Sequence, residues 1–179
     1  MMASKKSMIV LMGCSLFVVI SLILWSRPSF ATDNVFSRSS LRDLKGIEVY
    51  VENISPDLER DGLTRDQIQT DVVQMLQKAG IEVFGADESH QAPGAPYLRV
   101  KVDAKKDWET KLYAYSTHVE LRQLVVLVRT PNIMVGGITW STPGEEGTVA
   151  ATNLIKIRKS VREQVDKFIE AYRETNPSN

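Results

Sequence analysis

The chain of 179 residues is 43% hydrophobic, and its 22 Lys and Arg balance its 22 Asp and Glu. Residues 1–31 hold basic but no acidic side chains, so the remainder carries a net charge of about −3, which argues against a nucleic acid partner. The single cysteine, Cys14, lies in this leader, and two histidines without a thiolate exclude a structural zinc site in the remainder.

An apolar run over residues 8–25 follows Lys5 and Lys6, and Ser-Phe-Ala at 29–31 places small residues at a cleavage site. This layout predicts a secretory signal peptide. A run of about 18 residues is also long enough for a membrane anchor whose N-terminus stays inside. Lipid attachment at Cys14 is disfavoured, because the apolar run continues well past that residue. Both favoured interpretations export the rest of the chain.

We therefore expect three segments. The leader, residues 1–31, is either a signal peptide cut after Ala31 or an N-terminal membrane anchor, a polar linker covers 32–40, and a single domain covers 41–177. The exported part has no cysteine and must be stable without disulfides, as is common in bacterial periplasms. This favours a periplasmic location, tethered to the inner membrane by residues 8–25 if the leader is retained.

The first half of the domain alternates between strand and helix patterns. Side chains at 46–54 alternate as in a strand with one buried face, and 55–63 has the composition of turns. A helix is predicted over 64–79, where Thr64 and Gln67 fit a capping box and Gly80 supplies the stop. A short strand at 81–84 and a long polar loop at 85–96 follow.

The second half predicts three further strands and a helix. Strands are expected at 97–106, at 111–130 with a bulge near Gln123, and at 133–141 after a turn at Pro131-Asn132. A loop over 142–148 leads to an amphipathic helix that ends at Asn176-Pro177. The order β-α-β-β-β-β-α predicts the α+β class, with a mainly antiparallel four- to five-stranded sheet and two helices packed on one face.

Residues 47–84, "IEVYVENI…DGLTRDQIQTDVVQMLQKAGIEVF", resemble the opening strand-helix-strand unit of the TolB amino-terminal domain and related envelope modules. The closing pattern, Trp140 followed by a loop and "VDKFIEAYRETNP", resembles the end of uncharacterised exported bacterial proteins that share this head. Neither resemblance carries catalytic residues. Together they imply a periplasmic binding or assembly module.

No nucleophile elbow, phosphate-binding loop or dinucleotide motif is present, so we predict no catalytic residue, no cofactor and no metal. His118 is expected to point outward on its strand, without the positioned partner that a general base needs. Adjacent Glu145 and Glu146 are expected to point in different directions. A periplasmic hydrolase that uses carboxylates and His118 remains an alternative, as does a carrier of a small ligand.

Three aromatic residues, Trp108, Tyr113 and Tyr115, lie around the turn before the long hairpin and form the candidate interaction surface. The two tyrosines equally fit the core side of the sheet. The favoured function is a non-catalytic module that binds an envelope protein or membrane complex through its exposed sheet face or long hairpin. Membrane contact is expected only through the N-terminal segment, if that segment is retained.

Overall fold

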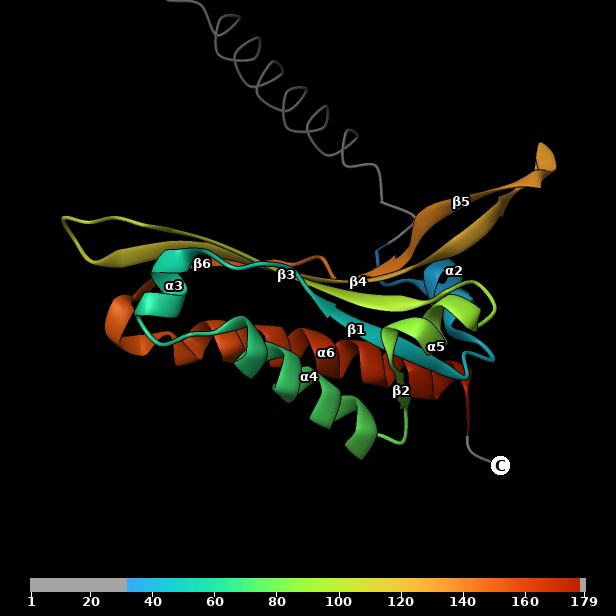
Figure 1. Cartoon of the computed structure of the whole chain (residues 1–179), viewed down its shortest axis with the longest axis horizontal. Coiled ribbons are helices and arrows are strands. Elements are labelled where there is room, and N and C mark those ends of the chain that lie inside the picture. The colour runs from blue at the N-terminus through green and yellow to red at the C-terminus, as the bar shows by residue number, and fades with distance from the viewer. Residues whose placement is uncertain (1–31, 178–179) are drawn as a thin grey trace, which may run out of the picture.

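The computed structural model describes residues 32–177, so the predicted leader, with its apolar run and cleavage site, lies outside the described residues. The fold is α+β, as predicted, with a sheet on one side and the longer helices, α4 and α6, on the other (Figure 1). The helical elements are α2 (Val35–Arg38), η1 (Ser39–Leu41), α3 (Pro56–Arg60), α4 (Arg65–Lys78), α5 (Ala86–Gln91), η2 (Ala151–Asn153) and α6 (Ile155–Thr175). The strands are β1 (Gly46–Val51), β2 (Glu82–Phe84), β3 (Tyr97–Lys106), β4 (Leu112–Leu127), β5 (Thr130–Ser141) and β6 (Glu145–Ala150).

The sheet has six strands in the order β2-β1-β3-β4-β5, and β6 pairs with β4 beside β5. β1 runs parallel to both β2 and β3, whereas β4 runs antiparallel to each of its three neighbours. The sheet is therefore mixed but mostly antiparallel. The sixth strand, β6, was expected to be a loop. Only Thr142, Pro143 and Gly144 lie between β5 and β6, and the residues after them pair with the first half of β4.

The core lies between the sheet and the two long helices. β1, β3 and β4 turn alternate apolar side chains toward α4 and α6, as the alternation in the sequence predicts. α4 begins with the predicted capping box, because the Thr64 hydroxyl accepts a hydrogen bond of 3.2 Å from the backbone N–H of Gln67. α6 covers the sheet with its apolar stripe, and Val161, Val165 and Phe168 are fully buried in it.

Three segments expected to be irregular contain short helices. α3 and α5 lie within the predicted turn and polar loop, and residues 32–40, expected to be a linker, contain α2 and η1. The side chains of Asn34 and Ser37 form a reciprocal cap at the start of α2, and Ser37 is buried. Such polar capping gives no apolar period in the sequence, which explains why it was missed.

β4 and β5 form a long hairpin whose far half extends beyond the rest of the sheet. β3 pairs with β4 only as far as Arg122, where the β4–β5 register shifts, close to the predicted bulge. The hairpin turn lies at Val128 and Arg129 rather than at the predicted Pro131-Asn132, and a second irregularity near Leu127 accommodates the proline. We call residues 123–138 the arm, and Figure 1 shows it bending away from the helices.

Candidate interaction surface

The three aromatic residues predicted as an interaction surface do not share one exposed face. Tyr113 is completely buried, and Tyr115 lies partly buried on the same helix-covered side of β4. Only Trp108, in the turn between β3 and β4, is exposed, at 54% of its surface. The two tyrosines therefore occupy the core side of the sheet, which was the alternative that the sequence left open.

Trp108 is surrounded by cations at the end of the sheet that is distant from the arm. The Lys106 ammonium lies 4.6 Å from the ring centroid, Lys111 lies 5.6 Å from it and the Arg60 guanidinium 5.7 Å. Lys106 also donates a hydrogen bond of 2.6 Å to the carboxylate of Asp61. These contacts brace the turn against α3, since cations over an indole face are attracted to its π electrons.

The hydroxyl of Tyr113 joins this cluster from the core side, because it donates a 2.8 Å hydrogen bond to the Asp61 carboxylate. The hydrogen bond from Lys106, followed by that from Tyr113, lowers the pKa of Asp61. Burial and the bond to Asp61 raise the pKa of Tyr113 to about 12. The arrangement stabilises the neutral phenol and the ionised carboxylate, which suits a structural contact rather than proton transfer near neutral pH.

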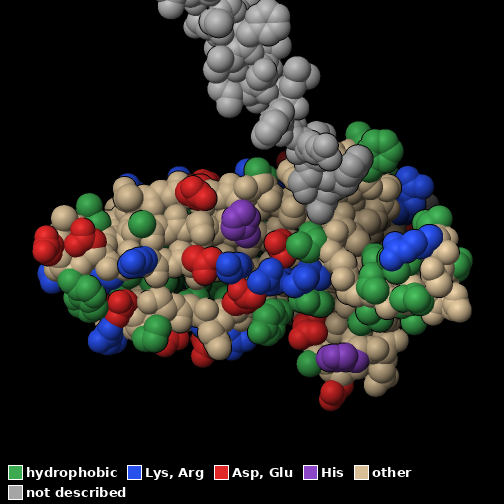
Figure 2. Space-filling view, turned by 90° about the horizontal axis from the view of Figure 1, so that it is seen from above, with side chains coloured by type: hydrophobic (Ala, Val, Ile, Leu, Met, Phe, Trp, Pro, Cys, Tyr) green, Lys and Arg blue, Asp and Glu red, His purple; other side chains and the backbone are tan. Residues whose placement is uncertain are grey.

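The outward face of the sheet is polar and carries no helix (Figure 1). At its centre Arg99 bridges two carboxylates, with Nε 2.8 Å from Glu52 and Nη1 3.0 Å from Glu120. Figure 2 looks onto this face and shows acidic and basic side chains interspersed over the middle of the molecule. Opposite charges thus neutralise each other locally, and this part of the face has no single sign of charge.

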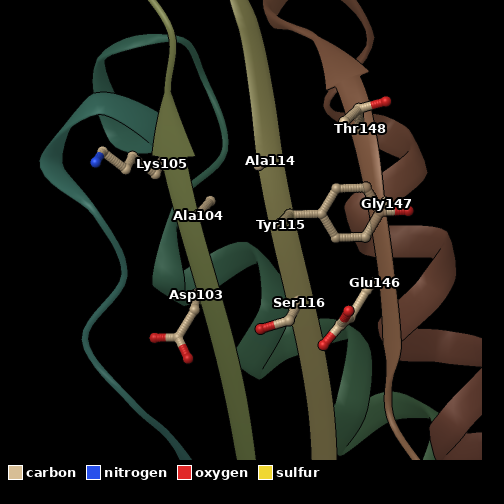
Figure 3. Close-up of a pocket in the computed structure, with 9 residues that line it drawn as sticks. All are labelled: Asp103, Ala104, Lys105, Ala114, Tyr115, Ser116, Glu146, Gly147 and Thr148. Carbon is tan, nitrogen blue, oxygen red and sulfur yellow. The ribbon is translucent and has the colours of Figure 1, made fainter.

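A hollow of about 600 Å³ lies over β3, β4 and β6 (Figure 3). The space exists because several of the residues that line it have small side chains. The ring of Tyr115 extends from β4 toward Gly147, where an added Cβ would lie only 3.1 Å from the ring. Two carboxylates, of Asp103 and Glu146, flank Ser116 in the hollow. Among residues 32–177, no group of three or more His, Cys, Asp and Glu is placed to hold a metal ion.

His118, the base in the hydrolase alternative, lies on the outward side of β4 under the turn between β5 and β6. A Cβ added at Gly144 would lie 2.3 Å from its Cε1 atom. Within the described part of the chain, its imidazole makes no hydrogen bond to a carboxylate. Glu145 accepts a 2.8 Å hydrogen bond from the hydroxyl of Ser160 on the helix side, whereas Glu146 lines the hollow, so the two carboxylates diverge as predicted.

Exposed apolar side chains gather on the arm, at the right-hand end of Figure 2. Seven of the thirteen large hydrophobic residues that are exposed in the described chain lie there: Leu124, Val126, Val128, Ile133, Met134, Val135 and Ile138. Sequence reasoning indicated the hairpin but not its exposure, because a continuous apolar run is equally typical of a buried strand. The arm is therefore the main apolar surface available for contact.

The arm joins the rest of the sheet at Arg122 of β4 and at residues 139–141 of β5, which we call its root. The root is bonded to the first described residues. Thr32 forms a parallel bridge to Ser141 at the end of β5, and the backbone N–H of Asp33 donates to the Ser141 carbonyl at 2.8 Å. The Asp33 carboxylate receives hydrogen bonds from Arg38 and from the buried indole of Trp140, at 2.6 and 2.9 Å. The bond from Arg38 is the main cause of the lowered pKa of Asp33.

No protein-family model matches this chain, and no curated protein matches it. The likeness to the head of the TolB amino-terminal domain thus stays a prediction. Among the helices of residues 32–177, none combines the length and apolarity that a membrane crossing requires.

Proposed function

We propose that this chain is an exported module of the bacterial cell envelope that binds another envelope component and has no catalytic activity. The observation that most supports this function is the projecting arm. Its apolar side chains are exposed although the same domain buries a continuous core elsewhere. Contiguous exposed apolar surface on a folded domain is typical of a contact site.

Two further observations favour this proposal. The leader sequence, with two lysines, an apolar run and small residues at 29–31, is typical of export. Gly144 of the turn packs closely against the imidazole of His118. Among residues 32–177, no carboxylate is hydrogen-bonded to this imidazole. A general base needs such a partner and access to a substrate proton, so the geometry favours binding over acid–base catalysis.

Export can be tested with alkaline phosphatase joined to the C-terminus of the full chain, since this reporter needs disulfides that form only outside the cytoplasm. Phosphatase activity is expected for the full chain and should be lost when residues 8–25 are deleted. Equal activity with and without residues 8–25, or none in either, would contradict an exported module.

Binding can be tested in cells by replacing Met134, in the arm, with a photo-crosslinking amino acid. The matched control carries the same probe at Glu109, an exposed position in the turn at the other end of β4. We expect crosslinked products from Met134 that are absent or much weaker at Glu109. If both positions give the same products, the arm is not the contact surface and the proposal loses its main support.

A further inference from the structure

The arm exposes apolar side chains on both of its faces, which constrains what can cover it. Cross-strand pairing places Val126 opposite Met134, and one residue further along it places Val125 opposite Val135. Successive side chains of a strand point to opposite faces, so these two pairs lie on different sides of the ribbon. A flat protein surface can cover one side only. A fluid lipid layer can surround both.

The charges of the arm differ from those of the remaining domain. No acidic residue occurs between Leu121 and Gly144, and the charged side chains in this stretch are Arg122 near the root and Arg129 at the tip. Within residues 32–177, neither guanidinium takes part in an ion pair. Apolar side chains flanked by unpaired arginines match a bilayer surface, where the apolar groups meet acyl chains and the arginines meet lipid phosphates.

The apolar run of the leader is tied to the chain close to the arm. Thr32 lies beside Ser141 at the arm's root, and seven residues separate it from Trp25, a span of about 25 Å at most. The arm tip, six residues beyond Arg122, reaches about 20 Å from the root. The link from the root to residues 8–25 and the arm are therefore of similar length, so a bilayer entered by residues 8–25 can contact the arm.

A second exposed apolar pair lies on α2, next to the root of the arm. Val35 and Phe36 on α2 are 83% and 77% exposed, although α2 packs beside β5. Phenylalanine and aliphatic side chains at this position would meet the same layer as the arm, since bilayer interfaces accept such groups readily.

We infer that the arm, with Val35 and Phe36, is a lipid-docking surface that rests the domain on the bilayer entered by residues 8–25. This inference deepens the proposed function and rests on it, because it names lipid as the envelope component. Contact must be shallow. The arm reaches about 20 Å from its root, short of a hydrocarbon core of about 30 Å, and the unpaired strand edges need water or headgroups.

The test uses the full chain with Cys14→Ser, reconstituted in vesicles of phosphatidylcholine with or without phosphatidylglycerol. A polarity-sensitive fluorophore is attached to Val128→Cys, and in a matched sample to Glu109→Cys in the turn at the opposite end of β4. Spin-labelled lipid serves as the quencher. We expect a blue shift and strong quenching at position 128, greater with phosphatidylglycerol, and neither effect at position 109.

A companion variant carries Met134→Asp together with the probe at position 128. Quenching should then be lost while the thermal unfolding curve stays unchanged, because Met134 is 64% exposed and contributes little to the core. An unquenched probe at position 128 in the parent chain would overturn the inference. So would quenching that disappears on dilution of protein in lipid, since a second copy of the chain would then be covering the arm.

The two proposals fail in different ways. A chain that is exported in cells but whose arm stays unquenched in vesicles keeps the proposed function and loses the lipid assignment. A chain that is not exported overturns the proposed function, and the inference falls with it, whatever the vesicles show.

Discussion

The indole N–H of Trp140 donates a 2.9 Å hydrogen bond to the carboxylate of Asp33, although 107 residues separate them in the chain. Trp140 is fully buried at the end of β5, and its ring packs edge-on against Phe168 of α6. One bond thus connects the start of the domain, the root of the arm and the core.

Acid should weaken the domain through Asp33. Its pKa is lowered, chiefly by the hydrogen bond from Arg38, so the contribution of its ionised form to stability is present above the ordinary value of 3.8. That contribution is lost as the pH falls through the lower, folded-state pKa. The difference in free energy of unfolding between wild type and Asp33→Asn should therefore shrink below pH 3.8.

Urea unfolding followed by Trp140 fluorescence, with Trp25→Phe and Trp108→Phe in the background, measures this difference. Arg38→Gln provides the control, since it should move the pKa of Asp33 back toward its ordinary value. A difference between wild type and Asp33→Asn that does not change with pH would show that the carboxylate charge is unimportant.

Alkali should act on Tyr113. Its pKa is raised from 10.0 to about 12, first by burial and then by the hydrogen bond to Asp61, so the folded state holds the phenol proton longer than the unfolded state does. The resulting stability is complete below pH 10.0 and is lost as the pH rises toward 12. Tyr113→Phe should lose less stability than wild type across this interval. Ultraviolet difference titration of the two proteins identifies the late-ionising phenol. Equal slopes of stability against pH would contradict the assignment.

Gly144→Ala should destabilise the domain more than Gly62→Ala. Both glycines have positive φ, +82° and +98°, and an alanine there costs about 1–2 kcal/mol. A Cβ at Gly62 meets nothing within 4 Å, whereas at Gly144 it meets the imidazole of His118 at 2.3 Å. The extra loss should disappear when His118→Ala is added. Thermal melts of wild type, Gly62→Ala, Gly144→Ala and the double variant Gly144→Ala with His118→Ala test this. Equal melting temperatures for Gly62→Ala and Gly144→Ala would refute the contact.

Gln164→Leu should cost about 1–3 kcal/mol, because it removes hydrogen bonds from two buried hydroxyl groups, those of Thr117 and Thr142. The Gln164 amide donates to the Thr117 hydroxyl at 2.5 Å, and its carbonyl accepts from Thr142 at 2.5 Å. The same substitution at Gln77, on the exposed side of α4, is the control and should be nearly neutral. Chemical unfolding gives both values. A neutral result at Gln164 would mean that this buried network does not stabilise the domain.

The sequence predicted most of the fold because apolar periodicity and capping signals are local. The capping box at Thr64 and the apolar stripe of α6 both appear as expected. β6 was missed because its pairing with β4 depends on residues 28 or more positions away. The same limit explains the parallel pairing of β1 with β3, which no pattern in either strand reveals.

The candidate interaction surface was harder to predict than the fold. Tyr113 and Tyr115 have the residue type of a contact site but face the helices, since the strand phase across the bulge near Arg122 was not fixed by sequence. The arm shows the opposite problem. Its apolar residues, such as Val126 and Met134, have the sequence pattern of a buried strand. They are exposed because the pairing of β3 with β4 stops at Tyr97, so the arm extends past the rest of the sheet.

Under the proposed export, the bridge between Thr32 and Ser141 also affects when the leader could be removed. A protease that cuts after Ala31 needs an extended backbone on both sides of the bond, yet Thr32 and Asp33 are held by β5 and Trp140 once the domain has folded. If the chain is exported, as we propose, β5 and α6 leave the translocation machinery last, and Thr32 and Asp33 have no bond to β5 or Trp140 until then. Cleavage after Ala31 would therefore have to occur before the domain finishes folding, and slower folding would favour cleavage.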